Sequence, residues 1–213
     1  MDPGATSMVW YVSYGSNLDP DRLGTYLGGG TPAGGHFTYR GARDASPPQA
    51  RRPCRIPHDL YFAGESRTWG GGIAFLDHEH IAPSPTLGHA YLVTAEQFED
   101  VAAQETGRDH AAIEMDEVRT TGSVTLGSGR YDRVVWLGDR DGIPQLTFTS
   151  PEPSSAAEPA APMPRYLHRI MVGLETAHGM TPEGSAAYLH RSSGVRGHWP
   201  IEALVTLASE GPE

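Results

Sequence analysis

A glutamate stands where a helical pattern would otherwise continue with an apolar residue. Phe98, Val101 and Ala102 have the i, i+3, i+4 spacing of one helix face, and Glu105 takes the i+7 position. A carboxylate in a core-facing position loses hydration, which raises its pKa towards neutrality, so it can accept and return a proton near pH 7. The pattern predicts a general acid/base at Glu105. A frayed helix end with a solvated carboxylate is the alternative.

A second candidate is the loop that follows the short apolar run at 9–13, with the sequence Tyr14-Gly15-Ser16-Asn17-Leu18. Asp19 and Pro20 come directly after it and form a helix-start signal. Backbone N–H groups beside a helix N-terminus favour a bound anion or a developing oxyanion. Gly15 permits close approach of a ligand to the backbone. The alternative is an ordinary strand-to-helix turn.

Other groups with reactive side chains have simpler explanations. Ser16 lacks the Gly-x-Ser-x-Gly context of an activated nucleophile. The run Asp77-His78-Glu79-His80 contains metal-capable side chains, but two histidines at i and i+2 are typical of a solvated turn, and no His-Glu-x-x-His pattern exists. The sequence therefore predicts neither a nucleophilic serine nor a metal site.

Two further segments could line a substrate pocket. Arg51, Arg52 and Arg55 could recognise a second carboxylate, although a solvated loop explains them equally well. The run Trp69-Gly70-Gly71-Gly72 lacks the following Lys-Ser/Thr of a phosphate-binding P-loop. We interpret it as a turn beside the pocket.

Composition narrows the classes of chemistry. The formal net charge is −10, which disfavours binding to nucleic-acid backbones. All sixteen basic residues are arginine, so the absence of lysine excludes Schiff-base chemistry and a pyridoxal phosphate anchor. Cys54 is the single cysteine, which leaves no disulfide framework.

The elements that must position these residues form an α+β pattern. Strand-like runs are predicted at 9–13, 59–64, 71–77, 87–93, 117–126, 131–137 and 145–149, with a loop over 41–58. Helices are predicted after Asp19, at 95–106 with a Thr94/Gln97 capping box, and at 166–178, 183–191 and 201–209. The Pro- and Ala-rich stretch 151–164 is typical of a flexible linker. We expect one domain over 1–150, this linker, and a helical C-terminal extension over 165–213 that packs on the core.

Three ordered blocks resemble the γ-glutamylcyclotransferase-like family. They are 12–18 (Val-Ser-Tyr-Gly-Ser-Asn-Leu), 60–74 with its Ser/Trp-Gly-Gly-Gly turn, and 88–93 (Gly-His-Ala-Tyr-Leu-Val) before the helix. In the family that helix ends in a Glu-Gly pair whose Glu is the catalytic acid/base, and Glu105 corresponds to it. The chain departs by placing Thr106 between Glu and Gly and by having Val101-Ala102-Ala103-Gln104 where the family has Leu-Asp. A family tyrosine is also replaced by the run 109–112.

The resemblance implies a small mixed β-barrel with surrounding helices. It also implies an enzyme that releases an amine from a γ-glutamyl amine or peptide and forms 5-oxoproline. Glu105 would move the protons and residues 14–18 would bind the small-molecule substrate, with no metal or organic cofactor. A role in secondary metabolism follows by family analogy only. A non-catalytic binding module of the same fold and an amide hydrolase are the alternatives.

The sequence also gives expectations about where the protein is located and how it assembles. No apolar stretch approaches the ~20 residues needed to cross a bilayer, and residues 1–7 lack the features of a signal peptide. We therefore expect a cytoplasmic protein with no membrane partner. The sequence leaves the oligomeric state open, a homodimer included.

Overall fold

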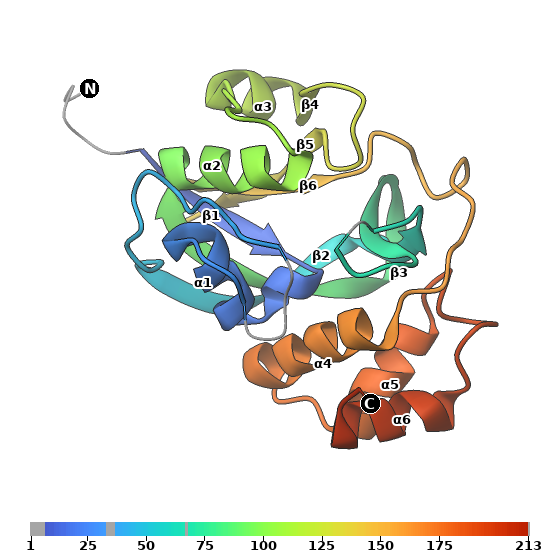
Figure 1. Cartoon of the computed structure of the whole chain (residues 1–213). Helices are drawn as coiled ribbons and strands as arrows, with labels where there is room; N and C mark the ends of the chain where they lie inside the picture. The colour runs from blue at the N-terminus through green and yellow to red at the C-terminus, as the bar shows by residue number, and fades with distance from the viewer. Residues whose placement is uncertain (1–6, 33–36, 67, 213) are drawn as a thin grey trace. The chain divides into compact units, whose positions relative to one another are not determined.

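The computed structural model describes residues 7–32, 37–66 and 68–212. Residues 1–6 of the N-terminal segment and residue 67 of the second family-like block lie outside the described residues. The strands are β1 (Met8–Ser13), β2 (Ala50–Ala63), β3 (Ile73–Thr94), β4 (Ser123–Thr125), β5 (Arg133–Arg140) and β6 (Ile143–Thr149). The helices are η1 (Ser16–Leu18), α1 (Pro20–Gly28), α2 (Ala95–Thr106), α3 (Met115–Thr121), α4 (Pro164–His178), α5 (Pro182–His190) and α6 (Ile201–Glu210) (Figure 1).

The strands form one six-stranded sheet in the order β2-β3-β1-β6-β5-β4. β1 runs parallel to β6, whereas β5 is antiparallel to both β6 and β4. The sheet is therefore mixed, which confirms the α+β class. Within the described residues the strand order has two ends, β2 and β4, so the mixed sheet does not close into a complete barrel.

Two compact units share this sheet, and each is built from three separate stretches of chain. Unit 1 comprises Met1–Val12, Leu23–Arg52 and Ala90–Pro151, and unit 2 comprises Ser13–Arg22, Pro53–His89 and Glu152–Glu213. β4, β5 and β6 belong to unit 1, while β2 and β3 have residues in both units. The domain boundaries expected at 150 and 164 stay a prediction.

Unit 1 has a core in which α2 packs on β1 and β6. Phe98 of α2 lies 5.7 Å from Tyr11 of β1 and 5.9 Å from Phe148 of β6, measured between ring centroids. Tyr11 and Phe148 stack at 5.3 Å. Buried residues of α1, α3 and β5 complete the cluster. The apolar face predicted for the 95–106 helix is the face that this core covers, and Figure 1 shows α2 lying along the strands.

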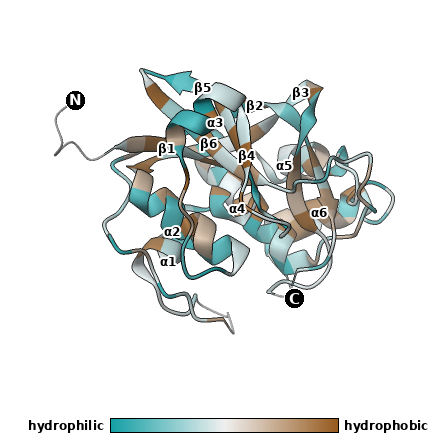
Figure 2. Cartoon of the chain, turned by 90° about the horizontal axis from the view of Figure 1, so that it is seen from above, coloured by the Kyte–Doolittle hydropathy of each residue, from teal (hydrophilic) through white to brown (hydrophobic). Residues whose placement is uncertain are grey.

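Unit 2 contains the three C-terminal helices, as the sequence predicted. Thr181 caps α5 by accepting a hydrogen bond from the Gly184 N–H, and Gly179 ends α4 in the left-handed conformation. α4, α5 and α6 pack against one another, and hydrophobic residues alternate with polar ones along them (Figures 1 and 2).

The stretch 151–164 runs along the strands of unit 2. The Ala160 N–H donates to the Phe62 carbonyl at 3.0 Å, and the Gly72 N–H donates to the Ala161 carbonyl at 2.8 Å. The Tyr61 hydroxyl donates to the Glu152 carbonyl at 2.7 Å. These hydrogen bonds attach the stretch to β2 and to the turn before β3.

Three strand predictions need correction. Residues 50–58, expected to be a loop, belong to β2, which lies at an end of the strand order where prolines are tolerated. The strands expected at 71–77 and 87–93 form a single strand, β3. Residues 117–126 were expected to form a strand but instead divide between α3 and β4.

The helix α3 replaces part of that strand for local reasons. Two acidic residues, Asp116 and Glu117, occupy its first turn, where they interact favourably with the helix dipole. The β-branched residues that suggested a strand are accommodated because the hydroxyls of Thr120 and Thr121 donate to carbonyls four residues earlier. Val118 is fully buried in the unit 1 core.

Candidate active site

The loop at 14–18, in unit 2, is a tightly packed single turn. Tyr14, Asn17 and Leu18 are buried, whereas Gly15 and Ser16 are half-buried. The Leu18 N–H donates to the Gly15 carbonyl at 3.0 Å and the Asp19 N–H donates to the Ser16 carbonyl at 3.2 Å. Within the described parts of the chain, the Ser16 hydroxyl makes no hydrogen bond. The Gly15–Ser16 end is therefore the more accessible part of the loop.

Helix α4 packs against the backbone of this loop. A Cβ atom on Gly173 would lie 2.3 Å from the Leu18 Cβ, so only glycine allows the helix to approach this closely. A Cβ on Gly15 would lie 3.1 Å from the Tyr166 hydroxyl oxygen. The Arg169 guanidinium binds the Asp19 carboxylate at 2.6 Å. Glycine at 173 is thus a packing requirement, while the space around Gly15 is tight.

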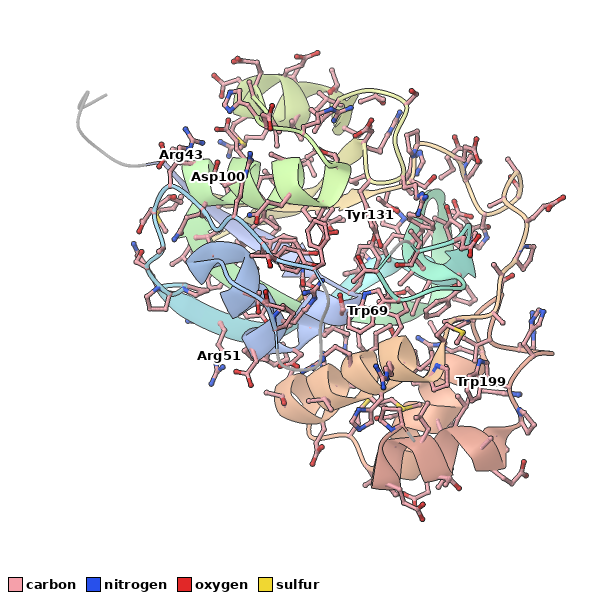
Figure 3. All side chains as sticks on the ribbon, viewed as in Figure 1. Arg43, Arg51, Trp69, Asp100, Tyr131 and Trp199 are labelled. Atoms are coloured by element: carbon pink, nitrogen blue, oxygen red, sulfur yellow. The ribbon has the colours of Figure 1, made fainter. Side chains whose placement is uncertain are left out.

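Aromatic and basic side chains of unit 2 lie beside the same loop. The rings of Trp69 (labelled in Figure 3) and Tyr166 lie 5.5 Å apart, and the Tyr166 hydroxyl accepts a hydrogen bond from the Ala74 N–H at 3.1 Å. The guanidinium of Arg22, which is buried, lies 5.4 Å from the Trp69 ring centroid. His89 Nδ1 is 2.9 Å from the Leu18 carbonyl oxygen. A cation and two aromatic rings suit an anionic ligand with a short apolar chain.

Glu105, in unit 1, lies in the last turn of α2 and is half-buried. Phe98, Val101 and Ala102 of the same predicted face are fully buried. The helix continues past Glu105 to Thr106, so the frayed helix end is not observed. The burial of Glu105 is intermediate between the dry and the solvated alternatives, and its acid/base role stays a prediction.

Both ends of α2 are capped. The Thr94 hydroxyl accepts from the Gln97 N–H, and the Gln97 side chain accepts from the Thr94 N–H, each at 3.0 Å, which confirms the capping box. At the other end Gly107 is left-handed, with φ 68° and ψ 30°. The Arg108 N–H donates to the Ala103 carbonyl at 2.8 Å. This pairing is a Schellman motif, and it defines where Glu105 sits on the helix.

A second carboxylate of α2 is more deeply buried than that of Glu105, since Asp100 is only 5% exposed. Arg43 compensates for this burial, since its Nε donates to Asp100 Oδ1 at 3.0 Å and its backbone N–H donates to Oδ2 at 2.8 Å (Figure 3). The hydrogen bond with Asp100 raises the pKa of Arg43. This pair anchors the 42–49 segment to α2.

The run Asp77–His80 lies in β3 and not in the expected solvated turn, and within it Asp77 is buried whereas Glu79 and His80 are exposed. His80 Nδ1 lies 2.9 Å from Asp59 Oδ2, and both side chains are exposed. No group of three or more possible metal ligands occurs among the described residues. Arg51 and Arg55 are exposed, and Arg52 lies over the Trp10 ring at 5.9 Å. Among the residues that the structure describes, no helix is both long and apolar enough to cross a membrane.

Sequence reasoning missed the contribution of α4 to the loop. Tyr166, Arg169 and Gly173 all contact the 14–19 segment, although the C-terminal helices lay outside the family-like blocks. The signal that could have found them is Gly173, because an isolated glycine within a helical pattern indicates close approach of another backbone.

Comparisons with known proteins bear on this geometry. No protein-family model matches the chain. A solved structure of a gamma-glutamyl cyclotransferase superimposes with a TM-score of 0.52 and 18% identity, covering 94% of this chain and 99% of that one. A solved structure of an uncharacterized human protein gives a TM-score of 0.51 at 18% identity with the same coverage. The chain has the γ-glutamylcyclotransferase fold.

The γ-glutamylcyclotransferase fold confirms the expectation drawn from the three sequence blocks. It includes the C-terminal helices, because the superposition covers nearly the whole of both chains. At this level of identity the likeness concerns the fold alone.

A similar sequence occurs within a much longer curated protein. The chain is 32% identical over 203 residues to Histone deacetylase 5 of Arabidopsis thaliana. The matched region covers 86% of this chain but only 30% of that protein. The chain thus spans less than a third of this relative's length.

Proposed function

We propose that the protein releases an amine from a γ-glutamyl amine or γ-glutamyl peptide by closing the glutamyl group into 5-oxoproline. The observation that carries this proposal is the superposition on a gamma-glutamyl cyclotransferase over nearly the full length of both chains. The position of Glu105 in the capped last turn of α2 supports it.

The proposed reaction is an intramolecular aminolysis. Glu105, as a carboxylate, takes one proton from the substrate's α-ammonium group, and the freed nitrogen attacks the γ-carbonyl carbon. The tetrahedral intermediate then breaks its bond to the leaving nitrogen as Glu105 returns the proton to that nitrogen. Glu105 next takes the second proton from the ring nitrogen and passes it to the released amine, so two protons in all move from the α-nitrogen to the leaving group. The products are 5-oxoproline and a free amine, and no water is consumed. Since both reacting groups belong to one molecule, correct folding of the substrate supplies much of the rate.

In this proposal the 14–18 loop binds the glutamyl end of the substrate. The half-buried Gly15–Ser16 end offers backbone N–H groups and a hydroxyl to the α-carboxylate or to the developing oxyanion. The buried Arg22 near Trp69 adds a positive charge to the same unit. We infer from these groups that the substrate is small and carries a carboxylate.

A non-catalytic binding module is the second candidate. It is favoured by one observation, namely that a similar sequence forms 30% of the length of a longer protein. Such a module would bind γ-glutamyl compounds without converting them.

The experiment is to incubate the protein with a panel of γ-glutamyl amines and peptides in H₂¹⁸O and to analyse the products by mass spectrometry. We expect 5-oxoproline without ¹⁸O. Glutamate carrying ¹⁸O would indicate a hydrolase, and binding without any product would indicate the module. Glu105→Gln should abolish turnover, whereas Glu96→Gln, which alters an exposed glutamate of the same helix, should not.

A further inference from the structure

A buried ion pair lies directly beyond the last turn of α2. Arg108 Nη1 donates to Asp132 Oδ1 and Arg108 Nη2 donates to Asp132 Oδ2, each at 2.6 Å. Asp132 has no solvent exposure, and the Arg108 side chain is 32% exposed. The two parallel hydrogen bonds fix the orientation of the guanidinium as well as its position.

The chain around Asp132 is shaped to hold this pair. The Gly129 N–H donates to Asp132 Oδ2 at 2.5 Å, and the Leu126 N–H donates to the Asp132 carbonyl at 2.7 Å. A Cβ on Gly127 would lie 2.3 Å from Arg108 Nη2 and 2.8 Å from Asp132 Oδ2. The 126–132 loop thus closes tightly around the guanidinium, which only a glycine at 127 allows.

This loop is itself fixed to the unit 1 core. Tyr131 (labelled in Figure 3) packs edge-on against Phe148, with ring centroids 5.8 Å apart. Phe148 in turn contacts Phe98 in the middle of α2. The ion pair therefore joins the end of the helix to the aromatic core of the same unit.

Arg108 belongs to the Schellman motif that ends α2. Its backbone N–H closes the last turn, which contains Glu105, while its side chain is held by Asp132. Helix ends otherwise fray, because their last carbonyls lack partners within the helix. On the other side of Glu105, the Gln104 side chain donates to the Tyr26 carbonyl at 2.9 Å and accepts from the Gly41 N–H at 3.3 Å.

We propose that Arg108 and Asp132 are positioning residues for Glu105, holding the last turn of α2 in the geometry that proton transfer needs. This inference rests on the proposed function. Glu105 acts only in the chemical step, so loosening its turn lowers kcat and leaves KM nearly unchanged. A displacement of about 1 Å at a reacting group lowers the rate by up to about a hundredfold.

The test compares Asp132→Asn with Asp139→Asn. Asp139 also pairs with an arginine of unit 1, Arg119, but neither residue belongs to α2 or to the motif that ends it. In Asp132→Asn we expect kcat to fall by about ten- to a hundredfold, KM to stay within about threefold, and amide hydrogen exchange at 105–108 to accelerate. Asp139→Asn should leave all three unchanged. Arg108→Lys keeps the charge but loses the paired hydrogen bonds. This variant should fold, and its kcat and its exchange rates at 105–108 should lie between those of wild type and Asp132→Asn.

Two results would overturn the proposal. One is unchanged exchange at 105–108 in both Asp132→Asn and Arg108→Lys. The other is accelerated exchange with wild-type kcat, since the turn would then move without consequence for catalysis. If the wild-type protein forms no 5-oxoproline, the proposed function fails, and the exchange measurement alone still decides whether the pair holds the turn.

Discussion

At the scale of single residues, the proposed chemistry depends on one carboxyl group and one glycine-containing turn. Glu105 is half-buried at the end of α2, and Gly15 and Gly173 permit close packing around the 14–18 loop. These positions tolerate little change for different reasons. Glu105 is proposed to move protons, whereas the glycines provide space.

Replacing Glu105 by glutamine tests the acid/base role. We expect kcat for 5-oxoproline formation to fall by about 10²- to 10⁴-fold, which is the range that general acid–base catalysis contributes. The free energy of unfolding should change little. Steady-state kinetics and circular dichroism check both expectations. Wild-type turnover in this variant would exclude Glu105 as the proton-transfer group.

Replacing Gly173 by alanine tests the contact between α4 and the loop. The added methyl group would collide with Leu18, and we expect a loss of about 1–3 kcal/mol in the free energy of unfolding measured in urea. Gly24→Ala is the matched control, because Gly24 also lies in a helix but has open space around its Cβ position. That variant should gain about 0.5–1 kcal/mol from helix propensity.

His178 gives unit 2 a dependence on pH. Burial lowers the pKa of His178, outweighing the hydrogen bond with the Gly88 carbonyl, which raises it. The unfolded chain therefore binds more protons, so the free energy of unfolding should fall as the pH drops below about 6.5. In His178→Gln this fall should be shallower in urea titrations between pH 7 and pH 5. An identical slope in wild type and variant would contradict the assignment.

At the scale of elements, α2 shows what the sequence can and cannot predict. Its start and its apolar face follow from local patterns, and the structure has both. The burial of Asp100 was not predictable, because its partner Arg43 lies 57 positions earlier. For the same reason the support that α4 gives to Leu18 was missed. Local capping can be read from sequence, whereas pairing between distant segments cannot.

The Gln97 side chain links the start of α2 to a neighbouring segment. Besides capping Thr94, its Nε2 donates to the carbonyls of Asp44 and Ser46 at 3.1 Å and 2.9 Å. We expect Gln97→Ala to lower the free energy of unfolding by about 1–3 kcal/mol, because buried polar groups lose their partners. Thr94→Ser, which keeps the capping hydroxyl, should have less effect in the same denaturation experiment. Equal stability of wild type and Gln97→Ala would show that water replaces the amide.

At the scale of the whole molecule, the fold was recognisable from the sequence. The fact that its strand order is open was not. The order of the strand-like runs and the 14–18 motif sufficed for the α+β class, while the open strand order depends on long-range pairing. The long strands β2 and β3 contain prolines and exposed polar stretches, so local patterns divided β3 into two strands and took part of β2 as a loop.

The interleaving of the two units carries a consequence for synthesis on the ribosome. Residues 13–22 belong to the same unit as 152–213. The ribosome must therefore synthesise most of the polypeptide before α4 exists and can pack against the Tyr-Gly-Ser-Asn-Leu turn. A nascent chain arrested near residue 150 should leave amides 14–18 unprotected from hydrogen exchange, and the released full-length chain should protect them. The 14–18 turn is therefore translated among the first residues and reaches its final packing among the last.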